Sequence, residues 1–216
     1  MARLTLWGRL SSCNVQKVLW VLEELELPYE RIDAGGDFGG LDEPAYRAMN
    51  PHGTVPTLRD GEQVVWDSDA IIRYLAASYG KGRLWPEDPG ERAVADQWLA
   101  WVNSTLYRDW IDLFWMLVRT PPEQQDAAGI EARRSRTAAR LAVLDRRLAE
   151  SAFVSGDALG LADIAAGMTL YRWFEMPIER PELAHVEAWY RTLRERAAYV
   201  NAVCRPFEDL KGKLGY

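Results

Sequence analysis

The chain has 216 residues, 48% of them hydrophobic, with a formal net charge of −6 and a pI near 5.1. This length allows one large domain or two small ones with a substantial core. The acidic balance argues against a nucleic acid or an anionic membrane as partner, because both need a basic surface. No stretch approaches the ~18 apolar residues of a membrane span, and we expect no signal peptide at the N-terminus.

Cysteine and histidine are scarce. Cys13 and Cys204 lie far apart and match neither a disulfide framework nor a zinc motif. Such usage suits a reducing compartment, so the cytoplasm is the expected location. With only His52 and His185, a histidine metal cage is not expected either.

The first 80 residues predict a complete small α/β domain with a mixed sheet, in the order β-α-β-β-β-α. A glycine-rich segment at 35–40 is expected to be a mobile loop, and Asp60-Gly61 marks a hairpin. The expected strands are residues 3–7, 29–32, 54–58 and 63–66, and the expected helices are 14–26 and a segment that opens at Asp67-Ser68.

The remainder of the chain predicts helices only. Residues 81–90 are rich in glycine and proline and are interpreted as a linker, so the expected domains are 1–80 and 91–216. One long helix, with room for a bend, should run from residue 91 to Pro121-Pro122. A later helix over 161–173 is apolar on most sides and should be buried.

The junction of the first strand and first helix carries Ser12, Cys13 and Asn14. A helix N-terminus offers free N–H groups and partial positive charge, which stabilise an anion such as a thiolate. Serine and asparagine are also preferred N-caps, so taken alone this feature favours capping.

Two further features lie later in the first domain. Val55-Pro56, directly before a strand, suggests a cis bond that leaves the Val55 backbone open to pair with an extended peptide; an ordinary turn is the alternative. Asp67 and Ser68 at a helix start could bind the ammonium and carboxylate of an amino acid, although N-capping alone also explains them.

These three features, in this order on this frame, resemble the glutathione transferase superfamily, and the resemblance covers essentially the whole chain. The residues around Ser12 and Asn14 are similar to bacterial members near the theta, phi and nu classes. The resemblance implies a thioredoxin-like N-terminal α/β domain, an all-α C-terminal domain and a homodimer. Glutathione is the implied co-substrate and a small hydrophobic electrophile the implied second substrate, with no metal.

The resemblance also implies roles for single residues. Ser12 aligns with the catalytic serine and Asn14 with the nu-class asparagine. Val55 would pair with the cysteinyl backbone of glutathione, with Pro56 cis and Thr54 beside it. Asp67 and Ser68 would hold the γ-glutamyl end.

The chain departs from the family pattern in three places. Asp67 stands where glutamate is usual, and Gly160 replaces the hydroxyl of the Ser/Thr-x-x-Asp capping box that ends at Asp163. Cys13 occupies nearly the place of the reactive cysteine in beta-type members. A glutathione-dependent disulfide or peroxide reductase, and a non-catalytic binding module, therefore stay open as alternatives.

The sequence says least about which residues form the electrophile pocket. We expect Trp110, Phe114 and Trp115 on the first long helix to line it, although adjacent residues on a helix point apart. His52 lies within the glutathione motif and is interpreted as an exposed turn residue.

Overall fold

The computed structural model describes residues 4–215. Its N-terminal part contains a four-stranded mixed sheet in the order β2-β1-β3-β4, in which β1 runs parallel to β2 and antiparallel to β3. The strands are β1 (Leu4–Trp7), β2 (Tyr29–Ile32), β3 (Thr57–Asp60) and β4 (Gln63–Trp66).

The third strand begins later than the sequence predicted. We expected it at 54–58, but the ladder pairs Thr57 with Trp66 and continues to Asp60. Pro56 has no N–H to donate, so it cannot join the ladder. Residues 54–56 instead form the turn before the strand.

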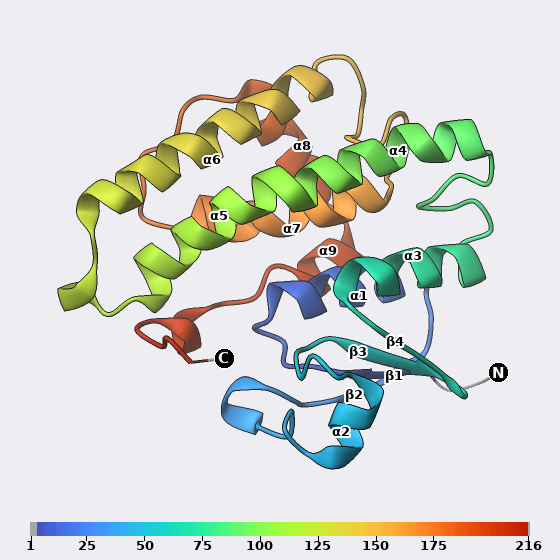
Figure 1. Ribbon diagram of the computed structural model, residues 1–216. Coiled ribbons are helices and arrows are strands. Elements are labelled where there is room, and N and C mark those ends of the chain that lie inside the picture. The colour runs from blue at the N-terminus through green and yellow to red at the C-terminus, as the bar shows by residue number, and fades with distance from the viewer. Residues whose placement is uncertain (1–3, 216) are drawn as a thin grey trace.

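Two helices cover one face of the sheet and a third lies on the other (Figure 1). α1 (Cys13–Glu24) and α3 (Ser68–Tyr79) lie between the sheet and the helical domain, and α2 (Pro44–Met49) lies on the far side. α1 ends two residues before its predicted limit because Glu26 takes a left-handed φ of 55°. The sequence missed α2, which has no apolar periodicity.

The segment expected to be a glycine-rich loop holds one short turn of 3-10 helix, Gly36–Phe38. Its glycines at 35 and 36 both have positive φ, which favours glycine at these positions.

The C-terminal part is helical throughout. α4 (Pro89–Trp101) continues through a π-helical turn into α5 (Tyr107–Phe114), which ends in a second π-helical turn at Arg119, before the two prolines. The other helices are α6 (Ala127–Leu148), α7 (Leu161–Glu175), α8 (Ala184–Arg194) and α9 (Ala197–Ala202).

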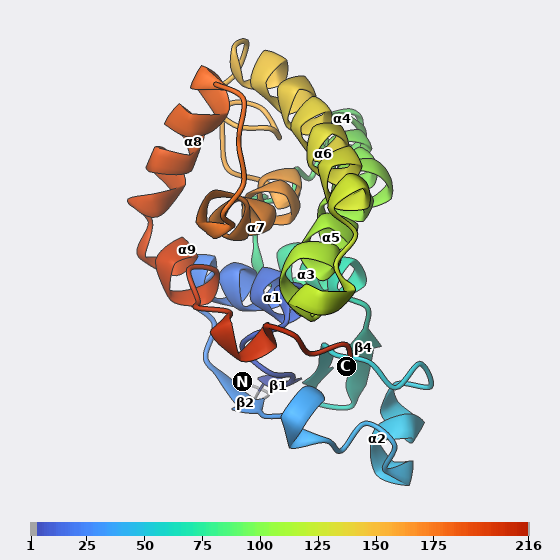
Figure 2. The ribbon, with the colours of Figure 1, turned by 90° about the vertical axis from the view of Figure 1, so that its left-hand side faces the viewer.

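α7 is the buried centre of this domain, as its sequence predicted (Figure 2). Its N-terminus has Gly160 as cap, and the Asp163 carboxylate accepts hydrogen bonds from the backbone N–H groups of Val154, Ser155 and Gly160 at 2.7, 3.0 and 3.0 Å. Burial raises the pKa of Asp163 to about 6, against the opposing effect of these hydrogen bonds. The carboxylate fixes this helix start without a hydroxyl at position 160.

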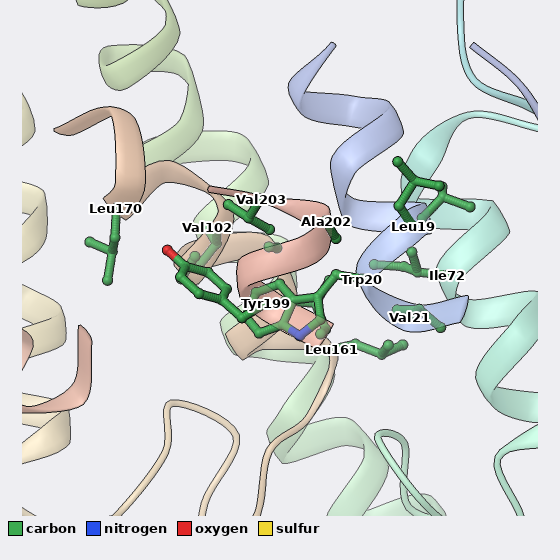
Figure 3. Packing of buried hydrophobic residues seen from close by; sticks show 14 of the residues in the cluster. Leu19, Trp20, Val21, Ile72, Val102, Leu161, Leu170, Tyr199, Ala202 and Val203 are labelled. Carbon is green, nitrogen blue, oxygen red and sulfur yellow. The ribbon is translucent and has the colours of Figure 1, made fainter. Parts of the chain in front are cut away.

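The two domains share one hydrophobic core. Trp20 of α1 meets Tyr199 of α9 edge to face, with ring centroids 4.8 Å apart (Figure 3). Gly167 of α7 allows this approach, because a Cβ there would lie 2.9 Å from the Trp20 ring. Beside it, both carboxylate oxygens of Glu24 accept from the Arg196 guanidinium at 2.8 and 2.6 Å. The N-terminal domain is therefore fixed against the helices by packing and by a buried carboxylate.

Within residues 4–215, none of the helices combines the length and the apolar character needed to cross a membrane.

Candidate active site

Side chains of α1 and α7 hold the loop between β1 and α1 by hydrogen bonds to its carbonyl groups. The Gln16 side chain donates to the Leu10 carbonyl at 2.9 Å, and Arg172 of α7 donates to the Ser11 carbonyl at 2.6 Å. Ser12 follows as the N-cap residue of α1, but its side chain makes no capping hydrogen bond. Its hydroxyl therefore does not cap the helix, although capping is the usual role of a serine at this position.

Cys13 is the first residue of α1 and is 7% exposed. Its Sγ lies 3.4 Å from the Tyr107 hydroxyl, and it packs with Trp110 and Met168. The thiol is thus packed against the helical domain.

The turn before β3 has the predicted cis Val55-Pro56 bond. The Thr54 carbonyl accepts from the Tyr46 hydroxyl at 2.7 Å and from the side-chain amide of Asn50 at 2.8 Å. Asn50 is fully buried. Val55 lies just before the paired residues of β3, so the structure holds its backbone outside the sheet.

Asp67 and Ser68 stand at the start of α3. Asp67 is its N-cap, and its Oδ1 accepts from the N–H groups of Asp69 and Ala70 at 3.0 and 3.1 Å. The Ser68 hydroxyl donates to the Asn14 side-chain oxygen at 3.4 Å. The capping interpretation of Asp67 is therefore correct, and it uses one of the two carboxylate oxygens.

A cavity of about 450 Å³ joins all these features. All seven residues predicted for catalysis and glutathione binding line it: Ser12, Asn14, Thr54, Val55, Pro56, Asp67 and Ser68. His52, exposed as predicted, also borders it. From α5 and the turn that follows, the lining residues are Tyr107, Ile111, Phe114, Trp115 and Arg119.

The structure separates the three aromatic residues named for the electrophile pocket. Phe114 and Trp115 line the cavity, whereas Trp110 is not among the lining residues and is 1% exposed. It stacks on Phe114 inside the core, with ring centroids 5.9 Å apart. Tyr107, Ile111 and Phe114 follow the i, i+4, i+7 stripe that faces the cavity, and Trp110 falls beside that stripe.

The sequence interpretation missed the positive charge of the cavity. Arg9, Arg119 and Arg172 line it, and they are 9%, 4% and 3% exposed. Asp67 is the one acidic residue in the described lining. Burial lowers the pKa of the Arg172 guanidinium, although arginine stays charged at neutral pH. A signal was available, since Arg172 is the one basic residue in the mostly apolar segment 161–173.

The C-terminal segment closes one side of the cavity. It leaves α9 and runs below α5 toward the N-terminal domain, and Leu210 contributes to the lining (Figures 1 and 2). Arg119 donates to the carbonyl oxygens of Lys213 and Gly215. The Lys213 ammonium in turn binds the Asp37 carboxylate at 2.6 Å.

Among residues 4–215 no group of three or more histidine, cysteine or acidic side chains could hold a metal ion. The cavity combines four features: the N-terminus of α1 with the Ser12 hydroxyl, the backbone of Val55 outside the sheet, the start of α3, and three arginine side chains. This set suits an extended peptide with an anionic group.

Comparison with known proteins agrees with this arrangement. Residues 6–83 match the family of glutathione S-transferase N-terminal domains, and residues 110–197 match the C-terminal domain family. The glutathione S-transferase GstB of Escherichia coli K12 is 45% identical over 205 residues, which cover 94% of this chain and 99% of that protein.

Solved structures show the same relationship. The theta class glutathione S-transferase from Xanthomonas axonopodis pv. citri, with glutathione bound, is 49% identical with a TM-score of 0.90, and the match covers 95% of this chain and 99% of that one. Bombyx mori glutathione transferase BmGSTD1 is 28% identical with a TM-score of 0.83, over 94% and 93% of the two chains. The chain therefore belongs to the glutathione S-transferase family.

Proposed function

We propose that this protein is a theta-like glutathione transferase that ionises the glutathione thiol beside Ser12 for attack on a hydrophobic electrophile. The observation that carries the proposal is the single cavity in which Ser12, Val55 and the Asp67-Ser68 pair meet. The relative from Xanthomonas axonopodis, solved with glutathione bound, has the same fold over nearly its whole length.

In this proposal glutathione lies across the N-terminal domain. The Val55 backbone pairs with the cysteinyl residue, with Thr54 alongside and Pro56 shaping the turn. At the γ-glutamyl end, the start of α3 binds the carboxylate together with the Ser68 hydroxyl, whose one proton turns from Asn14 to the ligand, and Asp67 binds the ammonium group. Asp67 can cap α3 and bind the ammonium group at the same time, because the capping hydrogen bonds are accepted by Oδ1 and leave Oδ2 for the ligand.

The chemistry needs a thiolate, because the thiolate and not the thiol is the nucleophile. To bring a thiol pKa of ~8.5 down by about two units, the thiolate must be stabilised relative to the thiol by roughly 2.7 kcal/mol. A hydrogen bond to a charged group contributes about 1.5–3 kcal/mol. The Ser12 hydroxyl and the N-terminus of α1 together supply this amount, and no general base is required.

The electrophile would bind on the side of the cavity formed by the helical domain. Ile111, Phe114, Trp115 and Leu210 supply apolar surface there, and Tyr107 supplies a hydroxyl. This surface follows from the spacing of residues along α5, which leaves Trp110 in the core.

The remaining organisation follows the same proposal. We place the domains at 1–80 and 91–216, joined by the linker 81–90, whose last two residues form the start of α4. We place the protein in the cytoplasm. A homodimer would set the first domain of each chain against the helical domain of its partner. The exposed apolar side chains Phe38, Trp66 and Val94 are available for such a contact. Sedimentation at micromolar concentration should give twice the 24.6 kDa chain mass.

Retention on immobilised glutathione, followed by electrophile, peroxide and disulfide assays, tests the proposal. We expect retention and conjugation of at least one hydrophobic electrophile. Turnover of disulfides or peroxides alone would favour the reductase, a possibility that Cys13 at the cavity keeps open. Binding without any turnover would favour a non-catalytic module.

A further inference from the structure

Arg172 is a buried cation that forms no ion pair within residues 4–215. It is 3% exposed and lies on α7, a helix that is otherwise mostly apolar. No carboxylate in the described part of the chain forms an ion pair with it, and its Nε has no hydrogen-bond partner there. Burying an arginine in this way is costly unless something compensates the charge.

The guanidinium is held in a fixed place. It lies 4.6 Å from the ring centroid of Phe114 and 5.7 Å from that of Phe207, in cation–π contact with both. Nη2 donates to the carbonyl oxygen of Ser11 at 2.6 Å. Arg172 therefore bridges the helical domain to the residue before Ser12.

The charged and titratable groups around Arg172 come from four other parts of the chain. Burial lowers the pKa of Arg172, and Arg9 of the loop after β1 lowers it further. Cys13 of α1, Tyr107 of α5 and Asp209 of the C-terminal turn act in the opposite direction and raise this pKa. Arg172, Ser11, Ser12 and Cys13 all line one cavity. An anion bound at the start of α1 would thus lie beside an unpaired positive charge.

We infer that Arg172 stabilises the glutathione thiolate, as a positioning residue that supplies charge from the helical domain and fixes the Ser11-Ser12 loop. This inference rests on the proposed function, and it adds a third source of thiolate stabilisation to the Ser12 hydroxyl and the N-terminus of α1. The helical domain then contributes to activating glutathione as well as to binding the electrophile.

Two glutathione derivatives distinguish the effect of a negative charge at the sulfur position from the affinity for the rest of the molecule. S-methylglutathione has no ionisable sulfur, whereas glutathione sulfonate carries a fixed negative charge at that position. In the wild-type protein the sulfonate should bind about tenfold more tightly than the methyl derivative, the effect of one charged hydrogen bond. Equal affinities would overturn the inference while leaving the proposed function intact. If neither compound binds, the proposed function fails and this inference fails with it.

Variants test whether Arg172 causes the preference for the negatively charged derivative. Arg172→Met should bring the ratio of the two affinities close to one and raise the kinetic pKa of bound glutathione, with the affinity for S-methylglutathione changed less than about threefold. Arg172→Lys keeps the charge and should restore part of the ratio. The matched control is Arg180→Met, because Arg180 is exposed just beyond α7 and binds the carbonyls of Trp173 and Met176. An unchanged ratio in Arg172→Met would overturn the inference, and should that variant not fold, Arg172→Gln takes its place with the same expected and contradicting results.

Discussion

The Ser68 hydroxyl donates to the side-chain oxygen of Asn14 at 3.4 Å, linking the N-terminal turns of α3 and α1. These are the two helix starts at which the proposed function places the γ-glutamyl end and the sulfur of glutathione. The hydrogen bond therefore couples the two ends of the glutathione site.

This coupling is measurable in a double-mutant cycle. Asn14→Ala and Ser68→Ala should each weaken glutathione binding, and the double variant should lose about 0.5–1 kcal/mol less than the sum of the two single losses. Isothermal titration with S-methylglutathione gives the affinities without turnover. Strictly additive losses would mean that the two helix starts bind independently.

Asp67 both caps α3 and faces the cavity, so two substitutions separate the roles. Asn is as good an N-cap as Asp and tolerates the positive φ of 72° at this position, but it carries no charge. Asp67→Asn should therefore keep the melting temperature and lose about 1.5–3 kcal/mol of glutathione affinity. Asp67→Ala should lose a further 0.5–2 kcal/mol, roughly, of stability. Unchanged affinity in Asp67→Asn would remove Asp67 from the binding site.

The pair formed by Glu24 and Arg196 should make stability depend on pH. Burial tends to raise the pKa of Glu24, but the hydrogen bonds from Arg196 and Trp20 outweigh it and lower the pKa overall. The folded state therefore holds the ionised form more strongly than the unfolded chain does. The contribution is present above the unfolded pKa of about 4.3 and is lost as the pH falls through the lower folded value.

Arg196→Gln tests this pair. It leaves a buried carboxylate with the Trp20 donor alone, so we expect a loss of about 1–3 kcal/mol at neutral pH, reduced because Arg196 is partly exposed. Urea unfolding at pH 7 and pH 4 should show the difference from wild type shrinking at the lower pH. A difference of the same size at both values would contradict the assignment. Arg194→Gln, at the end of α8 and two residues before Arg196, is the control, because Arg194 bonds to the Tyr190 hydroxyl and not to Glu24.

Gly167 allows α1 to approach α7 closely. An added Cβ would lie 2.8 Å from the end of the Leu193 side chain and 2.9 Å from the fully buried Trp20 ring. Alanine gains about 1 kcal/mol in helix propensity, but overpacking against a rigid ring costs about 1–3 kcal/mol. Gly167→Ala should therefore destabilise the protein by up to about 2 kcal/mol in urea unfolding. Gly129→Ala on α6 is not a neutral comparison, because a Cβ there meets Asp126 at 2.5 Å.

The sequence predicted the fold where local signals were strong. The limits of β2 and β4 agree with the structure, the cis Val55-Pro56 bond was predicted, and the buried apolar helix became α7. α2 escaped prediction because a six-residue helix with one buried residue, Tyr46, has no periodicity to detect.

The candidate site was predictable on the N-terminal side and not on the helical side. Ser12, Val55 and Asp67 belong to short motifs that the chain itself brings to one edge of a small domain. Arg172 and Tyr107 reach the same cavity only through packing of the helical domain, which no local pattern encodes. Trp110 and Trp115 differ in environment because a few residues along a helix change the face, and the sequence alone did not fix that face.

The central claim is that Ser12, and not Cys13, lies at the glutathione sulfur. The measurement that tests it most directly is the kinetic pKa of bound glutathione, taken from the pH dependence of kcat/KM in wild type, Ser12→Ala and Cys13→Ala. Ser12→Ala should raise this pKa by about one to two pH units and lower kcat/KM at neutral pH, since the lost hydrogen bond contributes about 1.5–3 kcal/mol. Cys13→Ala should leave both within error, because its thiol packs against Tyr107 and Trp110. If Cys13→Ala instead abolishes activity, and oxidised glutathione modifies Cys13 quantitatively in intact-protein mass spectra, the account is contradicted and the protein is a cysteine-type reductase.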